Sequence, residues 1–389
     1  MTNNPSIFSA SEPNLGYLYQ IRYGLMLIIS EPNDEAKLLI EKIDDISIDS
    51  LNSLDVYQTK FHVNSVANLT NASVDLWKTI RVWSEGIKNG SFNIDNSIFN
   101  LVTTATASNG TIPFKLKQGT QSIRDVDKIV DDLSQIARTS TNTINSKAYT
   151  SFLSLTVEQQ KGLVEKIIVT DASVDINEAK TKILHELRNS TLKKDALYER
   201  LEGWFLSEVI LQLQNLRAEI TAKEVRLKVI DVADTLKFDN LPNDFDASIT
   251  ADANQLNIYR GFTFVKQLEL VTVNPRSINH AISDYHRAFS QKSKWLREGL
   301  INPTDDIIYE NKLKEDWDKK FSIIINPADD EETQKRVGKI FYESHYVNQC
   351  PQIFIKDRFR ENYMITGCCH MISDKKEIGW HPNFENKIN

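Results

Sequence analysis

Residues 37–62 read KLLIEKIDDISIDSLNSLDVYQTKFH, and this stretch decides the expected fold of the N-terminal part of the chain. Its first half is rich in Ile and Leu, and its second half has the composition and alternation of a half-buried strand. The polar spacer at residues 49–55 (DSLNSLD) suits a hairpin turn. The stretch therefore predicts two strands joined as a β-hairpin.

Further elements are expected on both sides of this hairpin. Residues 15–29 (LGYLYQIRYGLMLII) carry apolar side chains on most faces and predict a buried helix that ends before Pro32. Residues 69–87 repeat apolar side chains at helical spacing, and residues 97–107 have the β-branched composition of another strand. The order helix, hairpin, helix, strand indicates an α/β or α+β domain with a small mixed sheet.

The chain becomes mainly helical after about residue 120. Residues 156–159 and 221–224 match capping boxes before helices, and a short strand is expected within EKIIVTD at residues 165–171. The sequence Leu-Pro-Asn-Asp at 241–244 favours a boundary. We therefore expect an α+β protein with three parts, which are an α/β domain (1–175), a helical connecting region (176–245) and a mainly helical C-terminal domain (246–389).

Composition restricts the classes of function. The 389 residues are 41% hydrophobic, include three cysteines, and contain no apolar run of about 18 residues that could cross a membrane. The N-terminus lacks the basic and apolar blocks of a signal peptide, so we expect a cytoplasmic protein without a membrane span. The net charge of −7 argues against one broad basic face for nucleic acid. Any phosphate contact must then be local, or shared with a partner or a bound metal.

Strand alternation gives the first indication of chemistry. If the first strand of the hairpin continues through Asp45, Glu41 and Asp45 project to one face. In the second strand Gln58, Lys60 and His62 share a face. Pairing the strands can then bring together two carboxylates, an amide oxygen, an amine and an imidazole.

Phosphodiester hydrolysis uses this mixture of groups. Oxygen ligands hold Mg²⁺, which lowers the pKa of a bound water, and a nearby lysine can support charge in the transition state. Gln58 would bind a metal only through its neutral carbonyl oxygen. The same spacing also fits a solvated sheet face, and Asp44 and Asp45 also fit turn positions. Spacing alone leaves these interpretations open.

A family resemblance favours the first interpretation. The pattern E-x-x-D-D at 41–45 and Q-x-K at 58–60, after a helix that bears G-x-x-Y-Q at 16–20, resembles the PD-(D/E)xK nuclease superfamily. It is most similar to the variant that has glutamine in place of the usual acid. That variant occurs in the double-stranded DNA endonuclease domains of CBASS-associated effectors.

The resemblance implies a role for each matching residue. Asp45 and Gln58 would be metal ligands, with Glu41 as an additional acid and ligand. Lys60 would be the catalytic lysine, and Gln20 a supporting polar residue of the catalytic site. The implied cofactor is Mg²⁺ or Mn²⁺, and residues 1–175 would form the nuclease domain.

Several longer segments carry a second resemblance. They are NASVDLWKTIRVWSEG (71–86), FNLVTTATASNG (99–110), LEGWF (201–205), ISDYHRAFSQKSKWLREGL (282–300) and GCCHMISDKKEIGWHPNF (367–384). Together they resemble the effector subunit of bacterial ABC-three-component defence systems, of which the Lamassu systems are the best known. This resemblance implies an LmuA-type nuclease that degrades double-stranded DNA. The partners it implies are an SMC-like ABC ATPase subunit and a small middle subunit, LmuB-like and LmuC-like, with a homo-oligomer as the active state. The C-terminal domain would serve complex assembly.

Two other interpretations stay open at this stage. The nuclease fold could be catalytically inactive and serve only to bind DNA or a partner of the same complex. The chain could instead be a structural scaffold subunit, which its acidic charge and long helical portion would suit. The chain has no Walker A motif, so any ATP in the complex would bind another subunit.

The C-terminal cysteines and histidines also invite a zinc interpretation. Adjacent cysteines rarely bind one tetrahedral metal, and no C-x-x-C spacing is present. We therefore expect buried thiols and packed histidines. Trp380, His381 and Pro382 fit either a rigid surface element for a partner or core packing. The residues concerned in the zinc interpretation are Cys350, Cys368, Cys369, His370 and His381.

Overall fold

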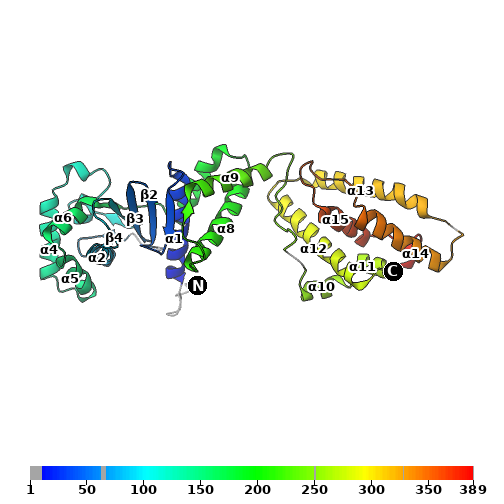
Figure 1. The fold of residues 1–389 in the computed structure, drawn as a ribbon, viewed down its shortest axis with the longest axis horizontal. Helices are drawn as coiled ribbons and strands as arrows, with labels where there is room; N and C mark the ends of the chain where they lie inside the picture. Colours follow the sequence, from blue (N-terminus) through cyan, green and yellow to red (C-terminus); the bar gives the residue numbers. More distant parts are fainter. Residues whose placement is uncertain (1–10, 63–66, 249–250, 327, 389) are drawn as a thin grey trace, which may run out of the picture. The chain divides into compact units, whose positions relative to one another are not determined.

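The computed structural model describes residues 11–62, 67–248, 251–326 and 328–388. The chain divides into two compact units, Met1–Ala233 and Asp234–Asn389 (Figure 1). This division differs from the expected three parts, because most of region 176–245 belongs to the first unit. Within that region two helices, at Ile176–Glu186 and Lys194–Leu213, pack on the N-terminal helix, and a short strand joins the main sheet.

The first unit is built around a six-stranded mixed sheet with the strand order β7-β5-β3-β2-β1-β8. Strands β1, β2 and β3 form an antiparallel meander, whereas β5 and β7 run parallel to β3. A two-stranded parallel sheet of β4 (Asn68–Leu69) and β6 (Thr106–Ala107) lies apart from it. The main strands are β1 (Lys37–Ile40), β2 (Ile46–Ser50), β3 (Ser53–Lys60), β5 (Ser97–Thr103), β7 (Ile167–Thr170) and β8 (Ile220–Thr221). The mixed sheet that the sequence predicts is confirmed.

The expected hairpin is present, but its first half is different. Strands β2 and β3 pair antiparallel through a tight turn, with Ser50 opposite Ser53. The expected single strand before that turn is wrong, because it is two strands, β1 and β2, joined by a loop at 41–45. The backbone N–H of Glu41 donates to the carbonyl of Asp45 at 3.1 Å, and Glu41 has a φ of 54°. Glu41 and Asp45 therefore close a loop and do not alternate along a strand.

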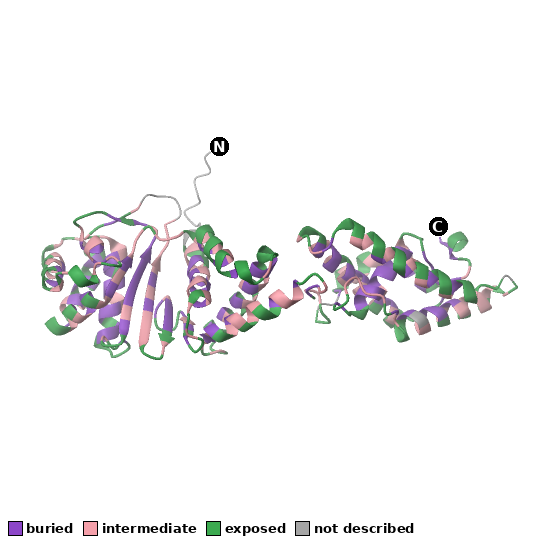
Figure 2. Ribbon diagram, turned by 90° about the horizontal axis from the view of Figure 1, so that it is seen from above, coloured by how far each residue is buried: buried purple, intermediate pink, exposed green. Residues whose placement is uncertain are grey.

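Helices cover both faces of the sheet (Figure 1). Helix α1 packs against β1, β2 and β3 as well as against α7 and α8, whereas α2 and α6 contact β5, and α4 and α5 pack with them on that side. Figure 2 shows buried residues along the sheet and on the inward sides of these helices. The helices are α1 (Ser11–Ser30), α2 (Val74–Lys88), α3 (Ile112–Lys115), α4 (Val126–Thr139), α5 (Ser146–Leu153), α6 (Val157–Lys166), α7 (Ile176–Glu186), α8 (Lys194–Leu213) and α9 (Ala222–Thr235).

Local signals in the sequence placed several of these elements correctly. Thr156 and Gln159 form the expected capping box of α6, and Thr221 with Glu224 makes the corresponding pair of hydrogen bonds before α9. Trp83 is buried with 1% of its surface exposed and packs on Phe99 of β5. Helix α2 therefore presents its apolar side to the sheet.

The second unit is helical. Helices α12 and α15 pack closely. Their backbones approach so nearly that a Cβ atom on residue 367 would lie 2.3 Å from the carbonyl oxygen of Asp284. Gly367 is therefore needed for this contact. The helices are α10 (Ala253–Tyr259), α11 (Thr263–Leu270), α12 (Pro275–Arg297), α13 (Pro303–Ile324), α14 (Glu331–Tyr342), α15 (Asn362–Asp374) and α16 (Phe384–Lys387).

The C-terminal cysteines and histidines lie within this packing. Cys368, Cys369 and His370 are buried on α15, and Trp380 and His381 are fully buried. Trp380 belongs to the core and is surrounded by aromatic rings. Among the residues that the structure describes, no three His, Cys, Asp or Glu side chains gather as a metal site. In the same residues, no helix is both long and apolar enough to cross a bilayer.

Candidate active site

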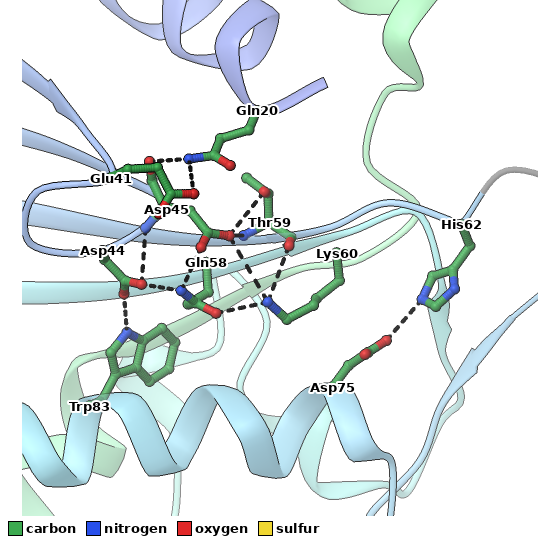
Figure 3. Close-up of polar contacts among 10 residues, drawn as sticks. All are labelled: Gln20, Glu41, Asp44, Asp45, Gln58, Thr59, Lys60, His62, Asp75 and Trp83. Atoms are coloured by element: carbon green, nitrogen blue, oxygen red, sulfur yellow. Dashed lines mark hydrogen bonds and ion pairs between the residues drawn. The ribbon is translucent and has the colours of Figure 1, made fainter. Parts of the chain in front are cut away.

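A polar cluster lies where the β1–β2 loop meets the last residues of β3 (Figure 3). The loop provides Asp44 and Asp45, and β3 provides Gln58 and Lys60. Helix α1 contributes Gln20, whose Nε2 donates to the backbone carbonyl of Asp45. The cluster therefore includes all the site residues that the sequence predicts, in a different local arrangement.

Asp45 is the residue on which most of these contacts meet. Its Oδ2 accepts the backbone N–H of Thr59 at 2.8 Å and the Thr59 hydroxyl at 3.1 Å. Its Oδ1 accepts the Nε2 of Gln58 at 2.9 Å. The Nζ of Lys60 lies 4.0 Å from Oδ2. Three hydrogen-bond donors and a cation therefore fix this carboxylate at the end of β3.

Lys60 is held close to Gln58. Its Nζ donates to the Oε1 of Gln58 at 2.7 Å and to the carbonyl of Thr59 at 3.2 Å. The side chains of Lys60 and Asp45 are 19% and 21% exposed. Both side chains are therefore partly sheltered from water, which strengthens interactions between charges at this position.

Glu41 occupies the α1 side of the cluster. The Nε2 of Gln20 donates to the Oε1 of Glu41 at 3.1 Å and also to the carbonyl of Asp45. Gln20 therefore joins α1 to both ends of the loop. Figure 3 shows the Glu41 side chain beside Gln20, away from Lys60.

Asp44 is the member of the cluster to which the family resemblance gives no role. It is only 8% exposed, and both its oxygens accept hydrogen bonds. The Nε1 of Trp83 donates to Oδ2 at 2.9 Å, whereas the Nε2 of Gln58 and the backbone N–H of Asp45 donate to Oδ1. Burial, reinforced by the neighbouring charge of Asp45, raises the pKa of Asp44 to about 7.

The donor atoms suit a hard divalent cation. The carboxylates of Asp44 and Asp45 both accept hydrogen bonds from the Nε2 of Gln58. Lys60 is the cation near Asp45. Mg²⁺ typically binds one or two protein carboxylates and keeps several waters, so it does not need a cluster of three acidic side chains. Asp45 and Gln58 would supply oxygen ligands, whereas the carboxylate of Glu41, the third expected ligand, accepts the Gln20 amide on the α1 side. Gln58 directs Nε2 toward the carboxylates here, so its Oε1 would reach a cation beside Asp45 only after the amide turns.

His62 extends the polar row beyond Lys60. Its Nε2 lies 2.8 Å from the Oδ2 of Asp75, in the first turn of α2. Figure 3 shows Lys60 and His62 both directed toward the α2 side of the sheet, as strand alternation predicts. The contact with Asp75 has no signal in the sequence, because the two residues belong to different elements.

A family model matches part of the second unit. Residues 264–388 are similar to C-terminal domain 7 of the ABC-three component (ABC-3C) systems. The matched residues include α12 and α15, so the packing of these two helices lies within the matched part.

Two solved structures resemble the chain only distantly. One is the Cap4 SAVED/CARF-domain containing receptor of Moraxella osloensis, with 15% identity and a TM-score of 0.35, over 71% of this chain and 68% of that chain. The other is the corresponding Acinetobacter baumannii receptor with the cyclic trinucleotide 3'3'3'-cAAA, with 12% identity and a TM-score of 0.33, over 71% and 69%. No curated protein matches the chain.

Proposed function

We propose that the chain is a metal-dependent double-stranded DNA endonuclease of the PD-(D/E)xK type, and the toxic, LmuA-like effector of an ABC-3C defence complex. The observation that carries this proposal is the contact of Lys60 with Gln58 at 2.7 Å and with Asp45 at 4.0 Å, at the end of β3. A lysine, an acid and an amide oxygen on one small surface suit phosphodiester hydrolysis. The similarity of residues 264–388 to a C-terminal domain of the ABC-3C systems supports a place in a defence complex.

Each residue of the cluster has a distinct task in this proposal. Asp45, Gln58 and Glu41 would hold Mg²⁺ or Mn²⁺, which when bound lowers the pKa of a water ligand and neutralises charge on the phosphoryl oxygens. Lys60 binds a non-bridging phosphate oxygen and supports the charge that grows there. Gln20 keeps the loop in place through Glu41 and the Asp45 carbonyl.

The remaining parts of the proposal concern partners. We place the chain with an SMC-like ABC ATPase subunit and a small middle subunit, which restrain the nuclease until foreign DNA is sensed. Self-association of released chains would align two sites on opposite strands of DNA. The net charge of −7 fits this dependence on assembly, because proteins that bind nucleic acid through one broad basic face usually carry a net positive charge.

The test is plasmid cleavage with Mg²⁺, with and without the partner subunits. Native protein should cleave, and EDTA or Lys60→Ala should reduce the rate by about 100-fold or more. Lys147→Ala changes an exposed lysine of α5 and should leave cleavage unchanged. Absence of cleavage in every assembly state would overturn the proposal. If Lys60→Ala also kept full protection in cells, the chain would instead be a non-catalytic binding subunit of the same complex.

A further inference from the structure

Asp44 and Asp45 direct their carboxylates to the same atom, although none of the roles above includes Asp44. The Oδ1 atoms of both residues accept hydrogen bonds from the Nε2 of Gln58. Neighbouring residues of a strand would point to opposite faces of the sheet. The loop between β1 and β2 removes that alternation and lets the two carboxylates converge (Figure 3). The Nε2 of Gln58 therefore marks a position within hydrogen-bonding reach of two carboxylate oxygens.

The carboxylate of Asp44 is buried without a cation of its own. Asp44 is only 8% exposed, and its hydrogen bonds come from Trp83, Gln58 and the backbone N–H of Asp45. Lys60 forms its ion pair with Asp45, and within the described ranges no lysine, arginine or histidine forms one with Asp44. Buried carboxylates in proteins are normally paired with a cation or coordinate a metal. A cation bound here would satisfy a charge that the chain itself leaves unpaired.

Trp83 determines which oxygen of Asp44 faces Gln58. Its Nε1 donates to Oδ2 at 2.9 Å, so Oδ1 is the oxygen that meets the Gln58 amide. Trp83 is 1% exposed and packs on Phe99, so its indole is held by the core. Hydrogen bonds from outer residues orient carboxylate ligands in this way in metal sites. The carboxylate of Glu41 instead accepts the Gln20 amide on the α1 side.

We propose that Asp44 is a second carboxylate ligand of the metal, together with Asp45; this inference rests on the metal site of the proposed function. The Oδ1 atoms of the two residues would bind the cation, and Gln58 would present its Oε1 after the amide turns. Two carboxylates and an amide oxygen suit Mg²⁺, which fills its remaining positions with water. Trp83 is then a positioning residue, because it acts through Asp44.

The first test measures Mn²⁺ binding to the full-length chain by titration calorimetry without DNA, so that cleavage plays no part. Asp44→Asn should lower the Mn²⁺ affinity by at least about 10-fold, because loss of even an outer partner of a metal ligand costs about 10- to 100-fold. Glu41→Gln should lower the affinity less. Asp49→Asn, at an exposed position of β2, is the matched control and should bind as the native chain does. Thermal unfolding without metal shows whether each variant is folded.

A thiolate in place of the carboxylate tests direct contact with the metal. Cd²⁺ prefers thiolate ligands, so its addition to Asp44→Cys should produce a thiolate-to-metal charge-transfer absorbance that the native chain lacks. Glu41→Cys is the matched control and should add no such absorbance. This readout separates a ligand from a residue that only stabilises the fold, because the absorbance requires a bond between sulfur and metal.

The outcomes separate this inference from the proposed function. Native Mn²⁺ affinity in folded Asp44→Asn, or a Cd²⁺ absorbance in Glu41→Cys but not in Asp44→Cys, would overturn the role of Asp44. Plasmid cleavage by the native complex would then leave the nuclease proposal intact. Absence of Mn²⁺ binding to the native chain would also overturn the inference. If Asp44→Asn weakens Mn²⁺ binding but the native complex cleaves no DNA, the metal site stands and the proposed nuclease activity fails.

Discussion

The indole of Trp83 donates a hydrogen bond of 2.9 Å to the carboxylate of Asp44, a residue 39 positions earlier in the sequence. This contact joins α2 to the β1–β2 loop beneath the candidate active site (Figure 3). Asp44 in turn accepts the amide of Gln58. The position of the proposed metal ligand Gln58 therefore depends on the core of the domain.

Replacing Trp83 by Phe should destabilise the first unit by about 1.5–3 kcal/mol, because a buried carboxylate loses a donor. Trp77→Phe is the matched control, since its indole donates at 2.8 Å to a backbone carbonyl, that of Asn71, and a neutral bond costs about 1 kcal/mol. Urea unfolding of both variants measures the difference. Equal losses would show that Asp44 does not need the indole.

The raised pKa of Asp44 predicts a pH-dependent stability in metal-free protein. Below about pH 4, Asp44 is protonated in both the folded and the unfolded chain. Between there and about pH 7, the unfolded chain releases this proton while the folded chain keeps it. The Asp44 contribution to the free energy of unfolding therefore falls as pH rises through this window.

Asp44→Asn removes that ionisation, so the free energy of unfolding should decrease less as the pH rises. Denaturant unfolding at a series of pH values with EDTA measures the effect, and Asp49→Asn, at an exposed position of β2, is the control. If the free energy of unfolding of Asp44→Asn falls as steeply with pH as that of the native protein, another group is responsible for the decrease.

Gln58→Glu should tighten metal binding and weaken the metal-free protein. A third carboxylate beside Asp44 and Asp45 repels both and loses the shared amide donor. A divalent cation offsets this repulsion, so Mg²⁺ should raise the melting temperature of Gln58→Glu more than that of the native chain. Thermal unfolding at several Mg²⁺ concentrations provides the measurement. An equal response in both proteins argues against Gln58 as a ligand.

Gly367→Ala should unfold the second unit while the first unit stays folded. The added Cβ would lie 2.3 Å from the backbone oxygen of Asp284, which can move only with α12. Gly203→Ala is the matched control, because no atom lies within 4 Å of a Cβ there and alanine stabilises a helix interior by about 0.5–1 kcal/mol. Limited proteolysis of each variant would locate the damage. A native-like digestion pattern of Gly367→Ala would show that α12 and α15 separate easily.

Local patterns of sequence predicted much of this fold. The helix before the hairpin, the β2–β3 turn and the capping boxes all depend on neighbours within a few positions. Alternation along β3 also placed Gln58 and Lys60 on one side, where they form a hydrogen bond. These features need only a regular backbone, and a single sequence carries that information.

The parts that sequence reasoning missed depend on distant contacts. A run of Ile and Leu around Glu41 has the composition of one strand, and nothing local indicates the positive φ that breaks it into two. Asp44 looks like a turn residue because its partner Trp83 belongs to a helix far along the chain. Strand β8 is only two residues long, and its pairing with β1 joins region 176–245 to the main sheet of the first unit.

The central claim is that Asp45 supports metal-dependent cleavage of DNA. The most direct measurement is the rate at which the assembled complex converts supercoiled plasmid to linear DNA with Mg²⁺, in native, Asp45→Asn and Asp49→Asn forms. We predict that Asp45→Asn is slower than native by about 100-fold or more while Asp49→Asn equals native. Equal rates for Asp45→Asn and the native complex would contradict the account.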